Sequence, residues 1–296
     1  MKNKTTRKAG GRKGSDRTEE LSFNKKYEKY LEHIRKLTLL DDAFMQKVFE
    51  DKECTELILK IILERDDLNV LQVNVQYDIK NLQGRSIRLD ILAVDENKKY
   101  YNIEVQNSDS GAVVKRARYN SSILDANITD PGDKYNALHE TYVIFITEND
   151  IIGAGLPIYH IERTVQETGK LFNDEEHIIY VNSSIKSEDQ LGRLMHDFSC
   201  TDAKEMNYKI LADRVRFFKE DAKGVKTMSS VIKQVKEESF EEGKAEGKAE
   251  GKAEGKILAN FDTAREMIED KEPIEKIVKY SHLTVEQIKE LSKQIL

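Results

Sequence analysis

Two carboxylates on neighbouring predicted strands have the clearest potential for chemistry in this sequence. Asp90 lies in the segment SIRLDILAVD and Glu104 in YYNIEVQ, and the polar stretch ENK separates the two segments. A three-residue loop over 96–98 would pair Asp95 with Lys99 in an antiparallel register, which puts Asp90 directly across from Glu104. Carboxylates about 5 Å apart on adjacent strands repel each other unless a cation lies between them.

Mg²⁺ is the cation that suits such a pair, because proteins hold it with one or two carboxylates together with water and phosphate oxygens. Bound Mg²⁺ lowers the pKa of a water ligand and stabilises charge on phosphorus, so the pair could hydrolyse phosphodiesters. Strand alternation places Asn102, Glu104 and Gln106 on one face, and that polar face could equally be solvated. The same alternation groups Leu89 with Ile91 on the face opposite Asp90.

The segments around the pair predict an α/β sheet with packed helices over about residues 23–200. Helical spacing of apolar residues predicts helices from Asp41 and over 111–127. Three β-branched and aromatic segments between them have strand length, and we expect them to form an antiparallel meander. The run TYVIFIT predicts a strand buried on both faces, and LPIYHIERT and EHIIYVNSS predict further extended segments. After Ser187 the pattern is helical to the end.

The composition changes along the chain and suggests polar extensions at both ends. Residues 1–22 form a basic leader that we expect to be disordered, and residues 201–241 a helical connector. Residues 242–256 repeat a Glu-Gly-Lys-Ala unit, and we expect a helical linker there that is solvated or joins copies into a homo-oligomer. Residues 257–296 predict a helical hairpin in which Thr284 and Gln287 form a capping box. A DNA-binding helix-turn-helix is the alternative.

Composition excludes several classes of protein. No apolar run approaches the about 20 residues of a membrane helix, and no apolar region follows the basic N-terminus as in a secretory signal. The chain has two cysteines, six histidines and a formal charge of −6. Neither the cysteines nor the histidines show a metal-ligand spacing, and the cysteines form no disulfide framework. We therefore expect a cytoplasmic protein without a membrane partner.

Several motifs together carry a resemblance to a known family. Asp90 followed by Glu104-Val105-Gln106 on the next strand is similar to the PD-(D/E)XK nuclease superfamily, in which Lys is commonest where this chain has Gln106. The order and spacing of longer segments resemble the recombination-promoting nucleases and transposase-like proteins of that superfamily. Those segments are DDAFMQKVF, RLDILAVDENKKYYNIEVQ, KRARYNSSILDANI, YVIFITENDIIGAGLPIY and GKLFNDEEHIIYVNSS. The resemblance covers about residues 38–200 and the repeat of the tail.

This resemblance implies a restriction-endonuclease-like mixed sheet flanked by helices, with a helical C-terminal tail, and a domain over residues 23–200 that cleaves DNA. The cofactor would be Mg²⁺, with Mn²⁺ as a substitute. Asp90 and Glu104 would be metal ligands, and the carbonyl of Val105 another. Gln106 is neither a cation nor a general base, so it could only orient water by hydrogen bonding.

Three residues outside the two strands are further candidates. Asp42 matches the N-terminal acidic position of the family and could complete the metal site, or it could be a simple helix N-cap. Arg116 and Tyr119 share a helix face and are candidates for contacts with nucleic acid, although Arg116 could instead form a surface ion pair. Arg118 lies about 200° around the helix from Arg116, so we expect it to have a different target.

The sequence leaves three functions open. The first is a metal-dependent DNA endonuclease that promotes recombination of mobile DNA. The second is a catalytically weak DNA-binding or assembly protein on a nuclease fold, which the Gln106 departure favours. The third is a nuclease that acts on RNA or on invading DNA with the same residues.

Overall fold

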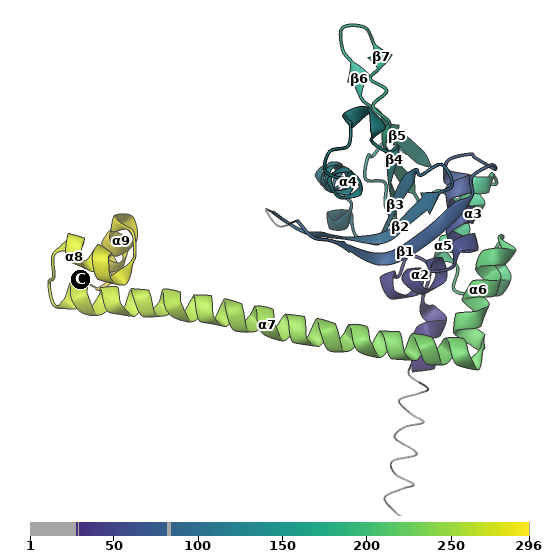
Figure 1. The fold of residues 1–296 in the computed structure, drawn as a ribbon. Helices are drawn as coiled ribbons and strands as arrows, with labels where there is room; N and C mark the ends of the chain where they lie inside the picture. The colour runs from purple at the N-terminus through teal and green to yellow at the C-terminus, as the bar shows by residue number, and fades with distance from the viewer. Residues whose placement is uncertain (1–27, 29, 82–83, 296) are drawn as a thin grey trace, which may run out of the picture. The chain divides into compact units, whose positions relative to one another are not determined.

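The computed structural model describes residues 28, 30–81 and 84–295 (Figure 1). The basic leader expected over residues 1–22 lies outside the described residues. The helices are α2 (Asp42–Phe49), α3 (Lys52–Ile62), α4 (Val114–Ile128), α5 (Gln190–Ser199), α6 (Lys209–Glu220), α7 (Ala222–Glu269), α8 (Ile274–Ser281) and α9 (Val285–Ile295), with short 3₁₀ turns η1 (Asp109–Gly111), η2 (Tyr135–Ala137) and η3 (Ala203–Glu205). The strands are β1 (Val70–Ile79), β2 (Ile87–Asp95), β3 (Tyr100–Gln106), β4 (Thr141–Thr147), β5 (Ile158–Ile161), β6 (Thr164–Val165), β7 (Lys170–Leu171) and β8 (Glu176–Asn182).

A mixed six-stranded sheet in the order β1-β2-β3-β4-β8-β5 forms the centre of the fold. β1, β2 and β3 pair antiparallel, which confirms the predicted meander. β4 runs parallel to both β3 and β8, because α4 crosses over between β3 and β4 and returns the chain to the same end of the sheet. β5 closes the edge antiparallel to β8, and β6 with β7 forms a separate hairpin. The mixed α/β sheet with flanking helices is as expected.

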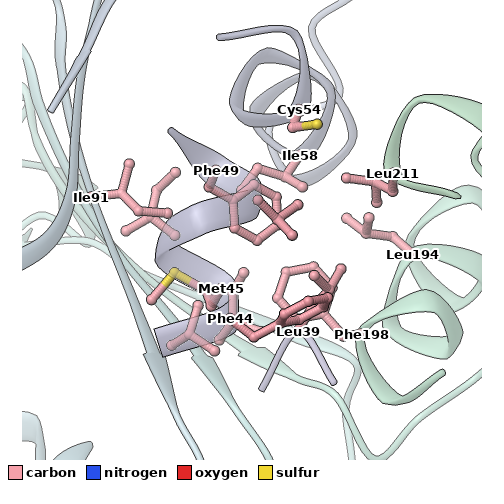
Figure 2. Packing of buried hydrophobic residues seen from close by; sticks show 14 of the residues in the cluster. Leu39, Phe44, Met45, Phe49, Cys54, Ile58, Ile91, Leu194, Phe198 and Leu211 are labelled. Carbon is pink, nitrogen blue, oxygen red and sulfur yellow. The ribbon is translucent and has the colours of Figure 1, made fainter. Parts of the chain in front are cut away.

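The main hydrophobic core lies between one face of the sheet and the helices α2, α3, α5 and α6 (Figure 1). Aromatic residues of α2 join the helices to one another: Phe49 stacks on Phe198 with ring centroids 5.7 Å apart, and Phe44 meets Phe218 edge-on at 6.3 Å. Figure 2 shows Phe49 close to Ile58, and the two side chains come from the successive helices α2 and α3. This packing fixes the start of α2, where Asp42 lies.

α4 covers the opposite face of the sheet with smaller apolar clusters. Its Leu124 packs in a cluster with Leu89 and Leu92 of β2. The prediction that Leu89 shares a face with Ile91 is therefore wrong, since Ile91 belongs to the main core. The paired residues of β2 and β3 run only from Ile91 to Val94, so the preceding residues of β2 are not held by that ladder to strict alternation.

The C-terminal part of the chain forms a second compact unit, from Lys233 onward. The end of α7 packs with α8 and α9 around buried Ala264, Ile277 and Leu291. Thr284 and Gln287 form the predicted capping box, with the Thr284 amide donating to Oε1 of Gln287 at 2.9 Å and the Gln287 amide donating to Oγ1 of Thr284 at 3.3 Å. The Glu-Gly-Lys-Ala repeat lies within α7. In the described part of the chain, no helix is both long and apolar enough to cross a membrane.

Candidate active site

The register between β2 and β3 brings the two predicted carboxylates together. Ile91 pairs with Ile103 and Val94 with Tyr100, and just beyond this ladder the Asp90 carboxylate accepts a hydrogen bond from the Val105 amide, next to Glu104. The tight turn over residues 96–98 fixes that register: the Asp95 amide donates to the Lys99 carbonyl at 3.2 Å, and Lys98 adopts a positive φ of 60°. The three-residue loop inferred from the sequence is thus observed.

The pair is buried, so the alternative of a solvated polar face is wrong. Asp90 is 9% exposed and Glu104 is fully buried, as is Asn102 beside them on β3. Burial raises the pKa of Asp90, and the nearby charge of Asp42 raises it further. Burial also raises the pKa of Glu104, and the Asp90 carboxylate adds to that increase. The two groups therefore cannot both ionise easily, which is the electrostatic condition that a bound cation relieves.

Asp90 is oriented by the strand that carries Glu104. The Val105 amide donates to Oδ2 of Asp90 at 3.1 Å, and Nε2 of Gln106 donates to the same oxygen at 3.3 Å. Because both donors meet Oδ2, the described residues leave Oδ1 of Asp90 to a cation or a proton. The amide of Val105 is the group seen at the pair, and its carbonyl as a metal ligand stays a prediction.

Glu104 is held at both oxygens by α4. Nη2 of Arg116 donates to Oε2 at 2.6 Å, and Nδ2 of Asn120 donates to Oε1 at 3.4 Å. The two donors are four residues apart on α4 and so share one helix face. The predicted ion pair of Arg116 is therefore made with a buried site carboxylate rather than on the surface. Asn120 is not among the site residues predicted from the sequence. Its position one helical turn after Arg116 is the only sequence signal that points to it.

Gln106 lies between Asp90 and Arg116. Nη1 of Arg116 donates to Oε1 of Gln106 at 3.4 Å and to the Gly111 carbonyl at 2.8 Å. A Cβ at position 111 would lie 1.9 Å from Oε1 of Gln106. A side chain at this position would push the Gln106 amide aside, so Gly111 in η1 helps to set the side chain that stands where Lys is commonest in the superfamily.

Asp42 begins α2 and does not cap it. The N-cap is Asp41, whose carboxylate accepts a hydrogen bond from the Thr38 amide at 2.7 Å, so the N-cap alternative for Asp42 is wrong. Partial desolvation and then Asp41 raise the pKa of Asp42, while Arg116 lowers it. The mutual influence of Asp42, Asp90 and Arg116 places all three in one electrostatic cluster.

This cluster fits a divalent metal ion. Its donor atoms are carboxylate oxygens, which hard cations such as Mg²⁺ prefer. When ionised, Asp42, Asp90 and Glu104 carry three negative charges against the single positive charge of Arg116, a balance that one divalent cation would neutralise. Asp90 and Glu104 would hold the ion, with Asp42 at the edge of the site.

A basic groove of about 870 Å³ adjoins the cluster. It runs between the first residues of β2 and the first turns of α4. Its lining residues are Arg85, Ser86, Ile87, Arg88, Ser110, Val113, Lys115, Arg116, Arg118, Tyr119 and Asn120. Arg118 lines the same groove as Arg116, and the expectation that the two side chains have different targets stays a prediction. Tyr119 also lines the groove, and its hydroxyl donates to the Arg85 carbonyl, so it orders the opposite wall.

Comparison with known proteins was made at the level of families, curated proteins and solved structures. A family model described as PD-(D/E)XK nuclease family transposase matches residues 40–193. The matched range contains the acidic cluster and the basic groove. No curated protein and no solved structure gives a significant match.

Proposed function

Because this chain belongs to the family of PD-(D/E)XK nuclease family transposases, whose fold implies hydrolysis of nucleic acid, we propose that it is a divalent-metal-dependent endonuclease that cleaves DNA. Mg²⁺ is the proposed physiological metal, with Mn²⁺ as a substitute. The proposed role is recombination of mobile DNA inside the cell.

The observation that carries this proposal is the position of Glu104. Its carboxylate is fully buried, lies on β3 next to the Val105 amide that binds the Asp90 carboxylate, and is held at both oxygens by α4. Two neighbouring buried carboxylates destabilise the fold unless positive charge compensates them. An arrangement with this cost in stability indicates that the two carboxylates serve a function.

Each side chain then has a role that its contacts support. Asp90 and Glu104 would hold the metal, which supplies an acidified water and stabilises charge on the scissile phosphate. Gln106 would orient the attacking water through its amide, since it has no basic nitrogen. Arg116 lies beside the pair and would contact the phosphate as charge develops on it.

The basic groove supports nucleic acid as the substrate. Arg85, Lys115 and Arg118 line it without any acidic residue among its lining side chains, so a phosphate backbone would be attracted along the groove toward Glu104. Tyr119 would contribute by holding the opposite wall of the groove in place through its hydrogen bond to the Arg85 carbonyl.

A second candidate is a catalytically weak protein that binds DNA or assembles on it. Gln106 favours this alternative, because a glutamine cannot take part in proton transfer to or from the water. Self-association through the repeat in α7 would belong to such a role, and sedimentation of the full chain would test it.

The decisive experiment is nicking of supercoiled plasmid with Mg²⁺, Mn²⁺ or EDTA. Asp90→Asn and Glu104→Gln keep the side-chain volume and should each reduce nicking by about 100-fold or more, since losing a ligand removes metal stabilisation worth several kcal/mol. Glu188→Gln, which changes an exposed carboxylate outside the cluster, is the matched control and should nick at the wild-type rate.

Two outcomes would redirect the proposal. Cleavage of RNA or of single-stranded DNA in preference to the plasmid would change the substrate but keep the acidic pair. The absence of nicking with every metal and nucleic acid, by protein of confirmed fold, would favour the binding and assembly function.

A further inference from the structure

A second group of metal-ligating side chains lies at the C-terminal end of α5, in the helical layer on the face of the sheet opposite α4. His196 and Asp197 are in the last turns of α5, and Cys200 caps that helix. The three residues offer ligand atoms that all lie within 4.8 Å of one another. The sequence expectation that no histidine or cysteine has a ligand spacing is wrong here, since His196 and Cys200 are one helical turn apart.

The three groups converge on one atom, Nδ1 of His196. Sγ of Cys200 is 3.4 Å from it, Oδ1 of Asp197 is 3.5 Å away, and the side-chain amide nitrogen of Asn207 is 3.1 Å away. That amide nitrogen is also 2.9 Å from Oδ1 of Asp197. The two contacts of Nδ1 with potential metal ligands are thus 3.4 and 3.5 Å long, whereas the two contacts of the Asn207 amide nitrogen have hydrogen-bond lengths.

The spacings of Nδ1 of His196 from Sγ of Cys200 and Oδ1 of Asp197 match the edges of a tetrahedral zinc site. Zinc binds cysteine sulfur at about 2.3 Å and histidine nitrogen or carboxylate oxygen at about 2.0–2.2 Å, so the edges of its tetrahedron are about 3.3–3.8 Å. The imidazole, thiolate and carboxylate are also the ligand types that zinc prefers in proteins.

The geometry argues against a catalytic relay. In a nucleophile–histidine–acid triad the nucleophile and the acid contact different ring nitrogens of the histidine. The histidine then takes a proton from the nucleophile at one nitrogen, and the acid stabilises the resulting imidazolium at the other. Here Cys200 and Asp197 both make their closer contact at Nδ1 of His196. Both partners therefore lie on the same side of the imidazole ring, where the three ligand atoms could bind one metal ion.

We propose that His196, Asp197 and Cys200 form a structural Zn²⁺ site, completed by Asn207 or a water. Binding would release the Cys200 thiol proton to solvent as the sulfur–metal bond forms. The Asn207 side chain would turn its carbonyl oxygen to the metal, or leave its corner to a water, and so free a lone pair of Asp197.

The exposure of these residues suits a structural metal site that an ion can reach from solvent. Asp197 is fully buried and Cys200 is 7% exposed, whereas Asn207 is exposed and the His196 side chain is 43% exposed. Asp197 also accepts the Asn207 and Tyr208 amides at 2.7 and 2.9 Å, so it already joins α5 to the segment before α6. A metal at this point would tighten the same junction.

Titration of the full-length, reduced, metal-free protein with Co²⁺ tests this proposal. One equivalent should produce a thiolate-to-cobalt charge-transfer band and the intense visible bands of four-coordinate cobalt, and Zn²⁺ should displace the Co²⁺. The acidic pair Asp90 and Glu104 has only oxygen ligands, so it cannot produce the thiolate band. The result is therefore independent of whether the proposed nuclease function holds.

Variants separate a true site from chance binding. Cys200→Ser should abolish the charge-transfer band. His196→Ala changes a half-exposed side chain, and it should weaken Co²⁺ affinity by more than the about 10- to 100-fold expected from an outer-shell change. Cys54→Ala, at the other cysteine, should keep the wild-type spectrum. The proposal is overturned if the wild type shows no thiolate band, if the band survives Cys200→Ser, or if Co²⁺ affinity is unchanged in His196→Ala.

Discussion

Replacing Arg116 by Met removes the positive charge next to Glu104 while keeping an unbranched side chain suited to a helix. Glu104 is fully buried and accepts a hydrogen bond from the Arg116 guanidinium at 2.6 Å, so the variant removes the shorter of its two α4 hydrogen bonds and keeps the longer one from Asn120. Removing one partner of a buried ion pair exposes the full desolvation cost of the other.

The loss of stability can be estimated from this geometry. Opposite charges with centres about 4 Å apart interact by about 4 kcal/mol at an effective dielectric constant near 20. The Arg116 side chain is 34% exposed, and water screens part of this attraction. We therefore expect the variant to lose up to about 2 kcal/mol of unfolding free energy without metal, the full loss appearing only at a pH where Glu104 is ionised in the wild type.

The loss should depend on pH in a defined direction. Burial and Asp90 raise the pKa of Glu104, and Arg116 opposes them, so the variant raises this pKa further. Between the pKa of Glu104 in the unfolded chain and its higher pKa in the folded protein, the folded protein keeps a proton on this carboxyl that the unfolded chain has lost. The free energy of unfolding therefore falls as pH rises through this range. The difference from wild type should be small near pH 5 and largest at pH 9 or above.

Urea unfolding at pH 5 and pH 9, with and without Mg²⁺, measures this difference. Lys115→Met removes a neighbouring exposed cation and should change stability by less than about 0.5 kcal/mol at either pH. Mg²⁺ should restore part of the loss in the Arg116 variant. Equal stability of that variant and the wild type at pH 9, or an equal loss at both pH values, would refute the role assigned to the ion pair.

Three further predictions concern the same site. Because burial raises the pKa of both Asp90 and Glu104, Mg²⁺ binding should release protons and weaken below neutral pH, which calorimetry in buffers of different ionisation enthalpy would detect; no proton release would contradict a bound metal at the pair. Gly111→Ala should displace the Gln106 amide and reduce nicking by about tenfold with the fold retained, as judged by thermal unfolding; an unchanged rate would exclude Gln106 from the reaction. Arg118→Glu in the basic groove should weaken DNA binding and reduce the slope of log affinity against log salt by about one, and an unchanged slope would place the DNA elsewhere.

The central part of the site could be predicted because it depends on local rules. Strand alternation and a loop of odd length are sufficient to set Asp90 across from Glu104, and both can be read from consecutive residues. The meander, the buried strand β4 and the capping box at Thr284 follow from equally local patterns.

Other features depend on contacts between segments that are distant in sequence. Asn120 is an ordinary polar helix residue until α4 packs on β3, and the role of Asp42 depends on how α2 meets the sheet. Leu89 left its predicted face because the paired residues of β2 and β3 begin only at Ile91. At the end of α5, Asn207 reaches His196 from the segment before α6, so no spacing within α5 could have indicated a fourth corner.

The turn over residues 96–98 has a consequence for how this fold can vary. Asp90 is five residues from the turn along β2, or about 17 Å at the usual rise per residue. Removing or adding one residue in the turn would shift the hairpin by one step and point Glu104 away from Asp90. An exposed loop is usually where a chain tolerates changes of length. Here the length of a distant surface turn is as strict a requirement for the acidic pair as the identity of its carboxylates.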